Sequence, residues 1–160
     1  RSLMGNHPAN PGLIGRRDFI MTGSASALFL TIAPLSAQAT PESVLGAIEK
    51  VIGAKAPKEG RVKVILAEIA ENGGTVPLKV SVDSPMTPED HVQAVHVFTD
   101  GNPFPEVASY YMGPHNGKAY LSIRLRLLKT QNVIAVAEMS NGETFISRKN
   151  IKVTIGGCGG

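Results

Sequence analysis

Cysteine, tryptophan and aromatic side chains in general are scarce in this chain. Its 160 residues include one Cys, no Trp and 5% aromatic residues. A single cysteine cannot form an internal disulfide, so we expect ordinary packing to stabilise the fold. Residues 40–160 contain 13 Lys or Arg and 12 Asp or Glu, and no basic tract with interleaved aromatics. This near balance of charge predicts that nucleic acid is not a partner.

The motifs of common catalytic centres are missing as well. The sequence has no G-x-S-x-G elbow, no phosphate-binding glycine loop and no dinucleotide fingerprint. His91 and His96 are five residues apart in an expected strand, which places them on opposite faces, and His115 lies in a Gly-Pro turn. This spacing is poor for metal ligands. We therefore expect no metal, no cofactor and no catalytic residue in the body of the domain, and each histidine is expected to be exposed or satisfied in the core.

No apolar run near the N-terminus is long enough to span a membrane. The run at residues 19–33 is interrupted by Thr, Gly and Ser, and it is shorter than the roughly 20 residues that a transmembrane helix needs. A cleaved signal explains such a segment better than a membrane anchor does. The mature protein is therefore expected to have no membrane association.

The residues around this run match an export signal. Arg16-Arg17 and Phe19 resemble a twin-arginine signal, and Ala37-Gln38-Ala39 matches an A-x-A cleavage site. Residues 1–39 are predicted to be removed, so that the mature protein begins near Thr40 in the periplasm. Because the twin-arginine route moves folded proteins, it also suits a subunit that is exported together with a partner.

The next segment has the pattern of a short amphipathic helix. Thr40-Pro41-Glu42 combines a hydroxyl cap, a proline suited to the first turn and an acidic residue. Apolar residues then recur at helical spacing, at Val44, Leu45, Ile48, Val51 and Ile52. The apolar stripe is expected to cover the core of the same domain, and an interface with a partner subunit is the alternative.

From residue 62 onward, apolar residues alternate with polar ones, which is typical of strands. Strands are expected at Val62–Ile69, Val76–Val82, Val92–Phe98, Val107–Met112, Ala119–Leu127, Val133–Glu138, Thr144–Ser147 and Ile151–Ile155. Glycine-containing segments such as Asn72-Gly73-Gly74 are predicted to be ordinary turns between them. The pattern predicts an all-β fold, an immunoglobulin-like antiparallel β-sandwich with an N-terminal helix, as one domain over residues 40–155.

Tyr110 and Tyr111 form the main aromatic cluster of the chain, followed by Met112. Large aromatic residues are usually buried, so we expect this cluster to belong to the sandwich core. A docking surface is the alternative.

The one cysteine lies near the end of the sequence, in the run Gly156-Gly157-Cys158-Gly159-Gly160. Glycine has no Cβ and adopts many backbone conformations, so residues 156–160 are predicted to form a flexible arm. Fully extended, these five residues reach at most about 17 Å beyond Ile155. The arm offers a nucleophile without a pocket. This arrangement is typical of a group carrier that visits the active sites of other proteins.

Two other functions stay open on the residues alone. A secreted β-sandwich interaction module would use Cys158 for an intermolecular disulfide and form a dimer. A ubiquitin-like sulfur carrier would instead use the terminal Gly160 as a thiocarboxylate and would need no thiol. Such carriers meet their activating enzymes inside the cell, so the predicted export signal argues against this alternative.

The run from Ile151 to Gly160 closely resembles the C-terminus of the SoxY family, the sulfur-carrier Y subunits of the bacterial sulfur-oxidising (Sox) system. The GGCGG ending is its most specific part. The leader, the N-terminal helix and an all-β body of similar length extend the resemblance over essentially the whole sequence.

The resemblance implies a role in thiosulfate oxidation as a carrier rather than an enzyme. Cys158 would be the covalent anchor of thiosulfate-derived sulfur, on a swinging arm and without a separate cofactor. The family's members pair with a Z subunit, SoxZ, as a heterodimer. The resemblance further implies transient docking to a c-type cytochrome pair that joins thiosulfate to the thiol, a hydrolase that releases sulfate, and a sulfane dehydrogenase that oxidises the remaining persulfide.

Overall fold

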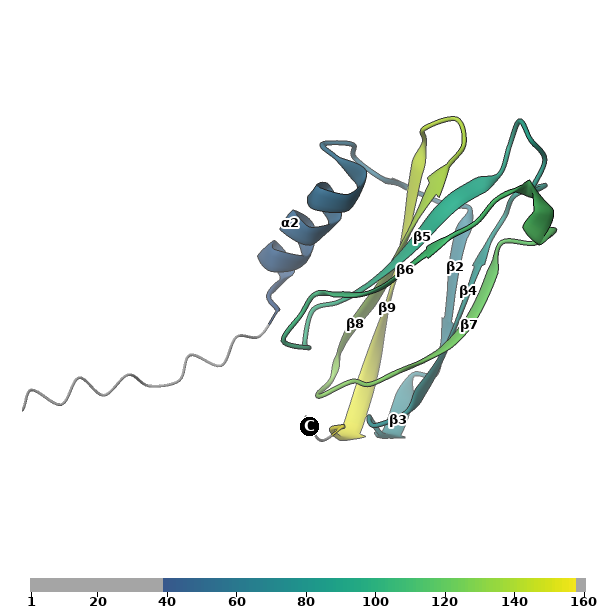
Figure 1. Cartoon of the computed structure of the whole chain (residues 1–160). Helices are drawn as coiled ribbons and strands as arrows, with labels where there is room; N and C mark the ends of the chain where they lie inside the picture. Colours follow the sequence, from purple (N-terminus) through teal and green to yellow (C-terminus); the bar gives the residue numbers. More distant parts are fainter. Residues whose placement is uncertain (1–38, 158–160) are drawn as a thin grey trace, which may run out of the picture. The chain divides into compact units, whose positions relative to one another are not determined.

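The structure, a computed structural model, describes residues 39–157 (Figure 1). Its one described α-helix is α2, Pro41–Ile52, which begins at the predicted position. The Ser43 amide donates to Thr40 Oγ1 at 3.2 Å, and the Thr40 amide donates to Ser43 Oγ at 2.8 Å. This reciprocal pair satisfies two amides that the first turn leaves without helical partners. The helix is too short and too polar to cross a membrane, and it is the only α-helix among residues 39–157.

The remaining described residues are mostly strands. Their bounds are β1 Lys58–Glu59, β2 Val62–Leu66, β3 Ile69–Asn72, β4 Val76–Val82, β5 Val92–Thr99, β6 Glu106–Tyr111, β7 Tyr120–Leu125, β8 Gln131–Met139 and β9 Thr144–Ile155. A single 3₁₀ turn, η1 Pro114–Asn116, lies between β6 and β7.

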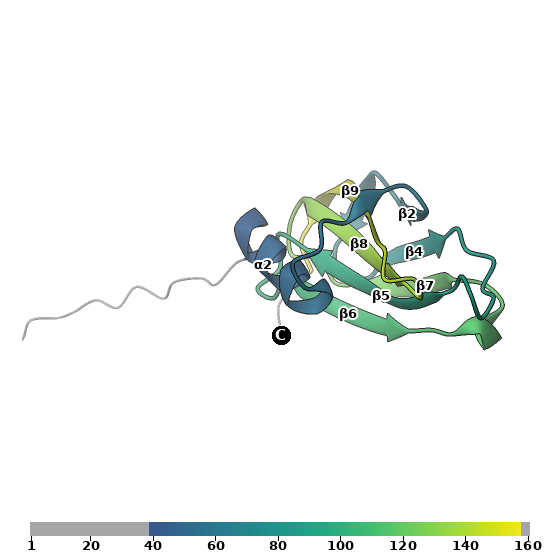
Figure 2. The ribbon, with the colours of Figure 1, turned by 90° about the horizontal axis from the view of Figure 1, so that it is seen from above.

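The strands form two sheets that face each other (Figures 1 and 2). The larger sheet has the order β1-β9-β8-β5-β6, with β3 also paired to β9, and the smaller has the order β2-β4-β7. The main strand pairings of both sheets are antiparallel, which confirms the predicted all-β sandwich. Two short strands depart from the antiparallel pattern, because β1 and β3 each pair with β9 in parallel. Both are too short to carry a periodic signal.

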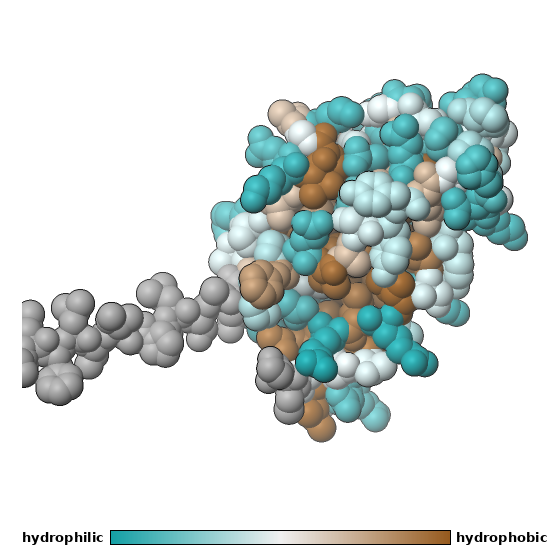
Figure 3. Space-filling view, viewed as in Figure 1, coloured by the Kyte–Doolittle hydropathy of each residue, from teal (hydrophilic) through white to brown (hydrophobic). Residues whose placement is uncertain are grey.

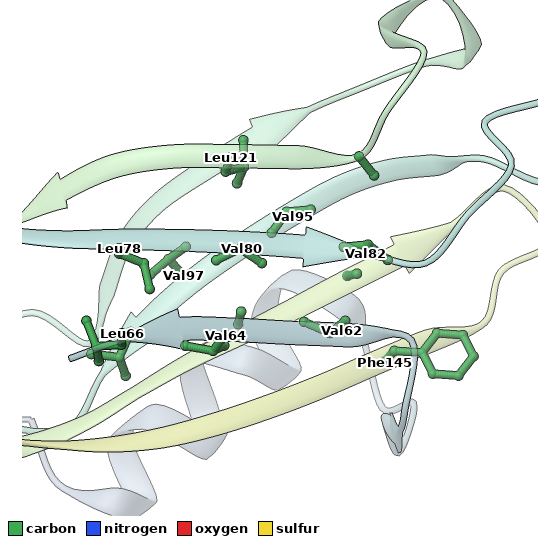
Figure 4. Packing of buried hydrophobic residues seen from close by; sticks show 14 of the residues in the cluster. Val62, Val64, Leu66, Leu78, Val80, Val82, Val95, Val97, Leu121 and Phe145 are labelled. Atoms are coloured by element: carbon green, nitrogen blue, oxygen red, sulfur yellow. The ribbon is translucent and has the colours of Figure 1, made fainter. Parts of the chain in front are cut away.

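The main core fills the space between the sheets (Figure 4). Leu78 and Val80 of β4 face it from the smaller sheet, and Val95 and Val97 of β5 face it from the larger one. All four side chains are at most 1% exposed. Because successive side chains of a strand point to opposite faces, the residues of β5 that alternate with Val95 and Val97 lie on the outer face of the larger sheet.

Helix α2 covers part of that outer face. Val44, Ile48 and Ile52 of the helix pack with Phe98 of β5 and Ile134 of β8 in a second, smaller apolar cluster. The prediction that the helix covers its own domain is therefore confirmed. Since both faces of β5 and β8 are covered, most residues of these two strands are buried.

Apart from shifts of one or two residues at the ends of other predicted strands, the structure differs from the predictions in two places. The expected strand Val62–Ile69 divides into β2, which pairs with β4, and β3, which pairs with β9. In contrast, the expected strands Thr144–Ser147 and Ile151–Ile155 are one continuous strand, β9. The polar residues 148–150 suggested a break, but they pair in register with residues 132–134 of β8.

The aromatic cluster is only partly in the core. Tyr110 and Met112 are partly buried and pack against the main core, as predicted. Tyr111 is 81% exposed, so its predicted burial is wrong. The reason is strand alternation, since Tyr111, the last residue of edge strand β6, points to the face opposite to that of Tyr110 and Met112.

An exposed ion pair connects β1 to the β8–β9 turn. Lys58 Nζ lies 2.7 Å from Glu143 Oε1, and this hydrogen bond lowers the pKa of the Glu143 carboxyl below its ordinary value. The ion pair therefore stabilises the folded state at pH values above the ordinary carboxyl pKa. This stabilisation is lost as the pH falls through the lowered pKa of Glu143 in the folded state.

We expect Lys58→Met to raise the Glu143 pKa toward its ordinary value in an NMR titration. Lys63→Met, on β2, should leave it unchanged.

Candidate functional site

The end of strand β9 is where the chain leads into the predicted arm. β9 ends at Ile155, next to β3, and Gly156 and Gly157 follow it (Figure 1). Cys158, Gly159 and Gly160 lie outside the described residues, as do Arg16, Arg17, Phe19 and Ala37 of the predicted signal. The site can therefore be built as far as Gly157, the residue before the cysteine.

Three backbone hydrogen bonds connect the end of β9 to two other parts of the chain. Gly73 N donates to Ile155 O at 2.7 Å, and Leu127 N donates to Gly73 O at 2.8 Å. Gly157 N then donates to Leu127 O at 2.9 Å. The three segments that these bonds join are called the glycine clamp below: residues 72–74, 126–128 and 155–157.

The clamp requires glycine because its segments approach each other closely. A Cβ added at Gly73 would overlap the carbonyl oxygen of Leu127, and a Cβ at Gly156 would overlap that of Leu128. Neither glycine has the positive φ that would explain it by backbone conformation. Glycine is present here so that one backbone can lie directly against another.

Gly156 and Gly157, which were predicted to belong to the flexible arm, contact the body in the structure. Gly157 is buried, and its amide is bonded to Leu127. The glycine run suggested freedom at every position, but the first two glycines serve close packing. The backbone is therefore bonded to the body as far as Gly157, called the root of the arm below, and the flexibility of the arm stays a prediction.

Sequence reasoning missed the partners of this root. Gly73 lies in a turn, as predicted, but its contact with the end of β9 was not predicted, and Leu127, predicted to end a strand, lies two residues after β7. Both lie far from Gly157 in the sequence, and only the parallel pairing of β3 with β9 brings Gly73 beside it. One feature of the sequence could have indicated this contact. Gly156 and Gly157 directly follow a strand, where no turn requires glycine, and this favours a close approach of two backbones.

The surface around the clamp is partly apolar. Ile69 of β3 is 59% exposed and Ile155 of β9 is 66% exposed. Figure 3 shows hydrophobic and hydrophilic surface side by side at the end of the molecule where β9 ends. Exposed β-branched residues at the root of an arm suit contact with other proteins.

Ala39, of the predicted cleavage site, is the first described residue. It is 6% exposed, packs with the helix cluster, and its amide donates to Asn102 O at 2.8 Å. Cleavage after Ala39 stays a prediction.

The histidines of the body do not form a metal site. His96 is 1% exposed and is satisfied by Ser109 Oγ at 2.7 Å and Glu138 Oε1 at 2.9 Å, as predicted for a core histidine. His115 lies in η1 and is exposed. Within residues 39–157, no group of three or more His, Cys, Asp and Glu side chains is placed to hold a metal ion.

Replacing His96 should test whether this buried network is structural. We expect His96→Leu to lower the free energy of unfolding by about 1–3 kcal/mol, because it leaves Glu138 without its buried partner. His115→Leu, at an exposed position, should change it by less than about 0.5 kcal/mol. Urea denaturation measures both. The rate at which Cys158 reacts should be the same in both folded variants, and a selective loss in His96→Leu would instead assign the network to the site.

A groove of about 820 Å³ lies at the other end of the smaller sheet, lined by residues that include Arg61, Lys63 and Lys118. Arg61 is bonded to Asp90 at 2.9 Å. The groove lies where β4 ends and β7 begins, whereas the clamp lies where β4 begins and β7 ends. It is therefore not part of the site at Gly157.

Comparison with known proteins supports the resemblance stated above. The family model described as "Sulfur oxidation protein SoxY" matches residues 48–158. A structure of the sulfur carrier protein SoxY from Chlorobium limicola f. thiosulfatophilum is 30% identical, with a TM-score of 0.61, and the match covers 71% of this chain and 98% of that one.

Other solved structures share the architecture alone. A superoxide reductase (neelaredoxin) from Ignicoccus hospitalis is 20% identical, with a TM-score of 0.53, and the match covers 72% of this chain and 94% of that one. At this identity the likeness shows the fold and says nothing of function. No protein with a curated description matches the sequence. The family match and the C. limicola structure agree, and the chain belongs to the SoxY family.

Proposed function

We propose that this protein is a periplasmic sulfur carrier, and that the Cys158 thiol holds sulfur derived from thiosulfate while the other Sox proteins act on it. The observation that carries the proposal is the extent of the family match, which runs to residue 158 and so includes the one cysteine of the chain. The similar chain from C. limicola is described as a sulfur carrier protein.

The chemistry of the carrier follows from its thiol. Oxidative conjugation would convert Cys–SH and thiosulfate into Cys–S–S–SO₃⁻, one proton and two electrons, and the electrons would pass to a c-type cytochrome. Hydrolysis of the S–SO₃⁻ bond by water would then release sulfate and a proton and leave the persulfide Cys–S–SH. A sulfane dehydrogenase would oxidise that remaining sulfur. The carrier forms and presents each bond, and its partners supply the catalysis.

The geometry suits this division of roles. Gly157 is bonded to the body at one end of the sandwich, Cys158 is the next residue of the chain, and residues 158–160 carry no side chain larger than the thiol. Small flanking residues favour entry into a narrow channel. Fixing the root keeps the thiol at a high effective concentration for a protein that docks at this end.

A Z subunit is the proposed permanent partner, and the heterodimer is the proposed unit of export. A homodimer linked through Cys158 would be an inactive side product in an oxidising compartment. This places the disulfide-linked dimer outside the working cycle.

A thiol-blocking experiment tests the proposal. The mature protein is incubated with its Z subunit, the conjugating cytochrome and thiosulfate, and free thiol is then measured with a maleimide. We expect the thiol to be lost only when both thiosulfate and the cytochrome are present, and to return on treatment with dithiothreitol. If the thiol stays free under all conditions, or is lost equally without thiosulfate, the carrier proposal is wrong.

A further inference from the structure

The outer face of the smaller sheet is uncovered in the part of the chain that the structure describes. Alternate residues of β2, β4 and β7 are buried in the main core, so the residues between them point to the opposite face. On the larger sheet, α2 covers the corresponding outer face (Figure 1). Within residues 39–157, no helix or strand packs in this way on the smaller sheet. The outward residues of β2, β4 and β7 are called the basic face below.

Three cations lie along one diagonal of the basic face. Lys63 of β2 is opposite Ser81 of β4, two residues from Lys79. Lys79 is in turn opposite Ser122 of β7, two residues from Arg124. Diagonal neighbours on a sheet are about 7–8 Å apart, so the three cations span about 15 Å. All three are exposed, and β2, β4 and β7 contain no Asp or Glu.

The fold itself gains little from this arrangement. Among residues 39–157, none of the three side-chain cations has a hydrogen-bond or ion-pair partner, and like charges on neighbouring strands repel each other. Charged residues on edge strands hinder aggregation, which accounts for Lys63 on β2 and Arg124 on β7. Lys79 lies on the central strand β4, where no edge needs protection. A partner of opposite charge explains all three positions.

Apolar groups are exposed beside the cations. Ile65 of β2 and Tyr120 of β7 are 43% and 47% exposed, and Pro77 of β4 is exposed between them and the clamp end of the sheet. The groove of about 820 Å³ hollows the other end of the face, where Lys63 and Tyr120 line it together with Asp83. Tyrosine and arginine are enriched in protein interfaces. The composition of the face therefore suits contact with a protein.

The size of the basic face suits a transient contact. With strands about 4.8 Å apart and about 3.4 Å per residue, three strands and the length of β4 give roughly 14 Å by 24 Å, or about 340 Å². Stable interfaces bury about 800 Å² on each partner, and encounters between redox proteins are among the smallest. Recognition of anionic lipids typically uses clusters of about four to eight Lys or Arg, more than this face carries.

We propose that the basic face docks an acidic surface of the c-type cytochrome that joins thiosulfate to the carrier. The inference rests on the proposed function, in which that redox protein must bind, accept two electrons and leave. Lys63, Lys79 and Arg124 would face carboxylates of the cytochrome, and Ile65 and Tyr120 would exclude water between the charges. Exposed charges of this kind chiefly accelerate association, which suits a partner that binds and leaves rapidly.

The position of the face is compatible with access to the arm. Arg124 pairs with Pro77 next to the end of β7, which is the end of the sandwich that carries the glycine clamp. A protein docked along the diagonal from Lys63 to Arg124 therefore also reaches the end at which β9 leads into the arm.

The test compares two variants that lose the same net charge. The face variant carries the substitutions Lys63→Gln, Lys79→Gln and Arg124→Gln. The control variant loses three exposed cations of α2 and β9, through Lys50→Gln, Arg148→Gln and Lys152→Gln. Thermal melts of both variants should stay close to that of the wild type, as for other surface substitutions. Iodoacetamide should alkylate the thiol at the same rate in all three proteins.

The kinetic measurement is kcat/KM for the cytochrome-dependent loss of free thiol, with the Z subunit and thiosulfate present. The face variant is expected to lower kcat/KM about tenfold at an ionic strength of about 0.02 M and less than about twofold at about 0.5 M, because salt screens exposed charges. The control variant should stay within about twofold of the wild type at both ionic strengths. An equal loss in the two variants, or a loss that persists at high salt, would overturn the proposal.

A binding measurement without thiosulfate locates the contact independently of activity. Titration of the ¹⁵N-labelled carrier with the oxidised cytochrome at low salt should shift or broaden amide signals of β2, β4 and β7, and the face variant should abolish the effect. Changes confined to other strands would contradict the proposal. So would salt-sensitive binding of the face to phosphatidylglycerol vesicles with no effect of the face variant on the cytochrome, which would assign the face to a membrane.

The two proposals can fail separately. If the cytochrome binds the basic face while thiosulfate never loads the thiol, the docking surface stands and the carrier proposal fails. If thiosulfate loads the thiol at equal rates in the face and control variants, the carrier proposal stands and the docking surface fails.

Discussion

Cys158→Ser is expected to reduce thiosulfate-dependent oxidation by the reconstituted Sox proteins to the background rate. The chain has one cysteine, so no other side chain can form the S–S bond on which the proposed cycle depends. Serine is close in size but holds its proton far more firmly, and it cannot form a persulfide. The free energy of unfolding should change by less than about 0.5 kcal/mol, as for ordinary surface substitutions. Activity and denaturation curves are measured on the same preparation.

A thiol moved onto the body provides the control for this variant. In Cys158→Ser combined with Thr154→Cys, the thiol lies at an exposed position of β9, four residues earlier. We expect it to react with iodoacetamide and yet to restore no oxidation, because a group on a strand within the sheet cannot enter another protein's active site. Retained oxidation in Cys158→Ser alone would favour a terminal thiocarboxylate, and a loss of dimers without loss of activity would favour a structural disulfide.

Gly73→Ala is expected to lower the free energy of unfolding by about 1–3 kcal/mol. The added Cβ would overlap the Leu127 carbonyl oxygen, so one segment of the clamp must move, and overpacking of this kind typically costs that much. Movement there weakens the hydrogen bonds that Gly73 makes with Ile155 and Leu127. Because the Gly157 amide donates to the carbonyl of the same residue, Leu127, this amide should exchange with solvent faster in the variant.

Gly46→Ala is the matched control for the clamp. Gly46 lies in α2 and has no heavy atom within 4 Å of an added Cβ. Alanine should therefore stabilise the helix, by up to about 1 kcal/mol, without affecting Gly157 exchange. Both variants replace glycine with alanine, but Gly73→Ala is expected to lower the free energy of unfolding and Gly46→Ala to raise it. Equal stability of both variants, with unchanged exchange at Gly157, would mean that the clamp is not tightly packed.

Much of the fold could be predicted from local patterns. The cap at Thr40 and the apolar stripe of Val44, Ile48 and Ile52 predicted α2, and the alternation in β4 predicted that strand at its observed bounds. These features depend on residues close together in the sequence. The long strand β9 was predicted as two, because charged Arg148 and Lys149 lie in its middle, where the structure has them exposed and half-buried in a continuous ladder with β8.

Pairings between distant segments were not predictable in the same way. β3 is four residues long and pairs in parallel with a strand about 80 residues later, so no local pattern records the contact. Tyr111 was assigned to the core from its residue type, but its position on edge strand β6 exposes it. In each case tertiary context decided the outcome.

In the candidate site, too, local features could be predicted from the sequence and contacts between distant segments could not. Cys158 was predicted from its setting among glycines, which needs no structure. The glycine clamp could not be predicted from the sequence, because Gly73, Leu127 and Gly157 come from three separate segments. The structure therefore changes the interpretation of Gly156 and Gly157. They hold the root of the arm to the body as well as keeping the arm thin.

Intact mass spectrometry tests the central claim most directly. The mature protein is purified from thiosulfate-fed cells of its own source and is weighed with and without reductant. The carrier account predicts reductant-removable additions of sulfur or of a thiosulfonate, and fragmentation should assign them to the peptide of residues 153–160 that trypsin releases after Lys152. A bare thiol or a homodimer alone, with and without thiosulfate feeding, would contradict it.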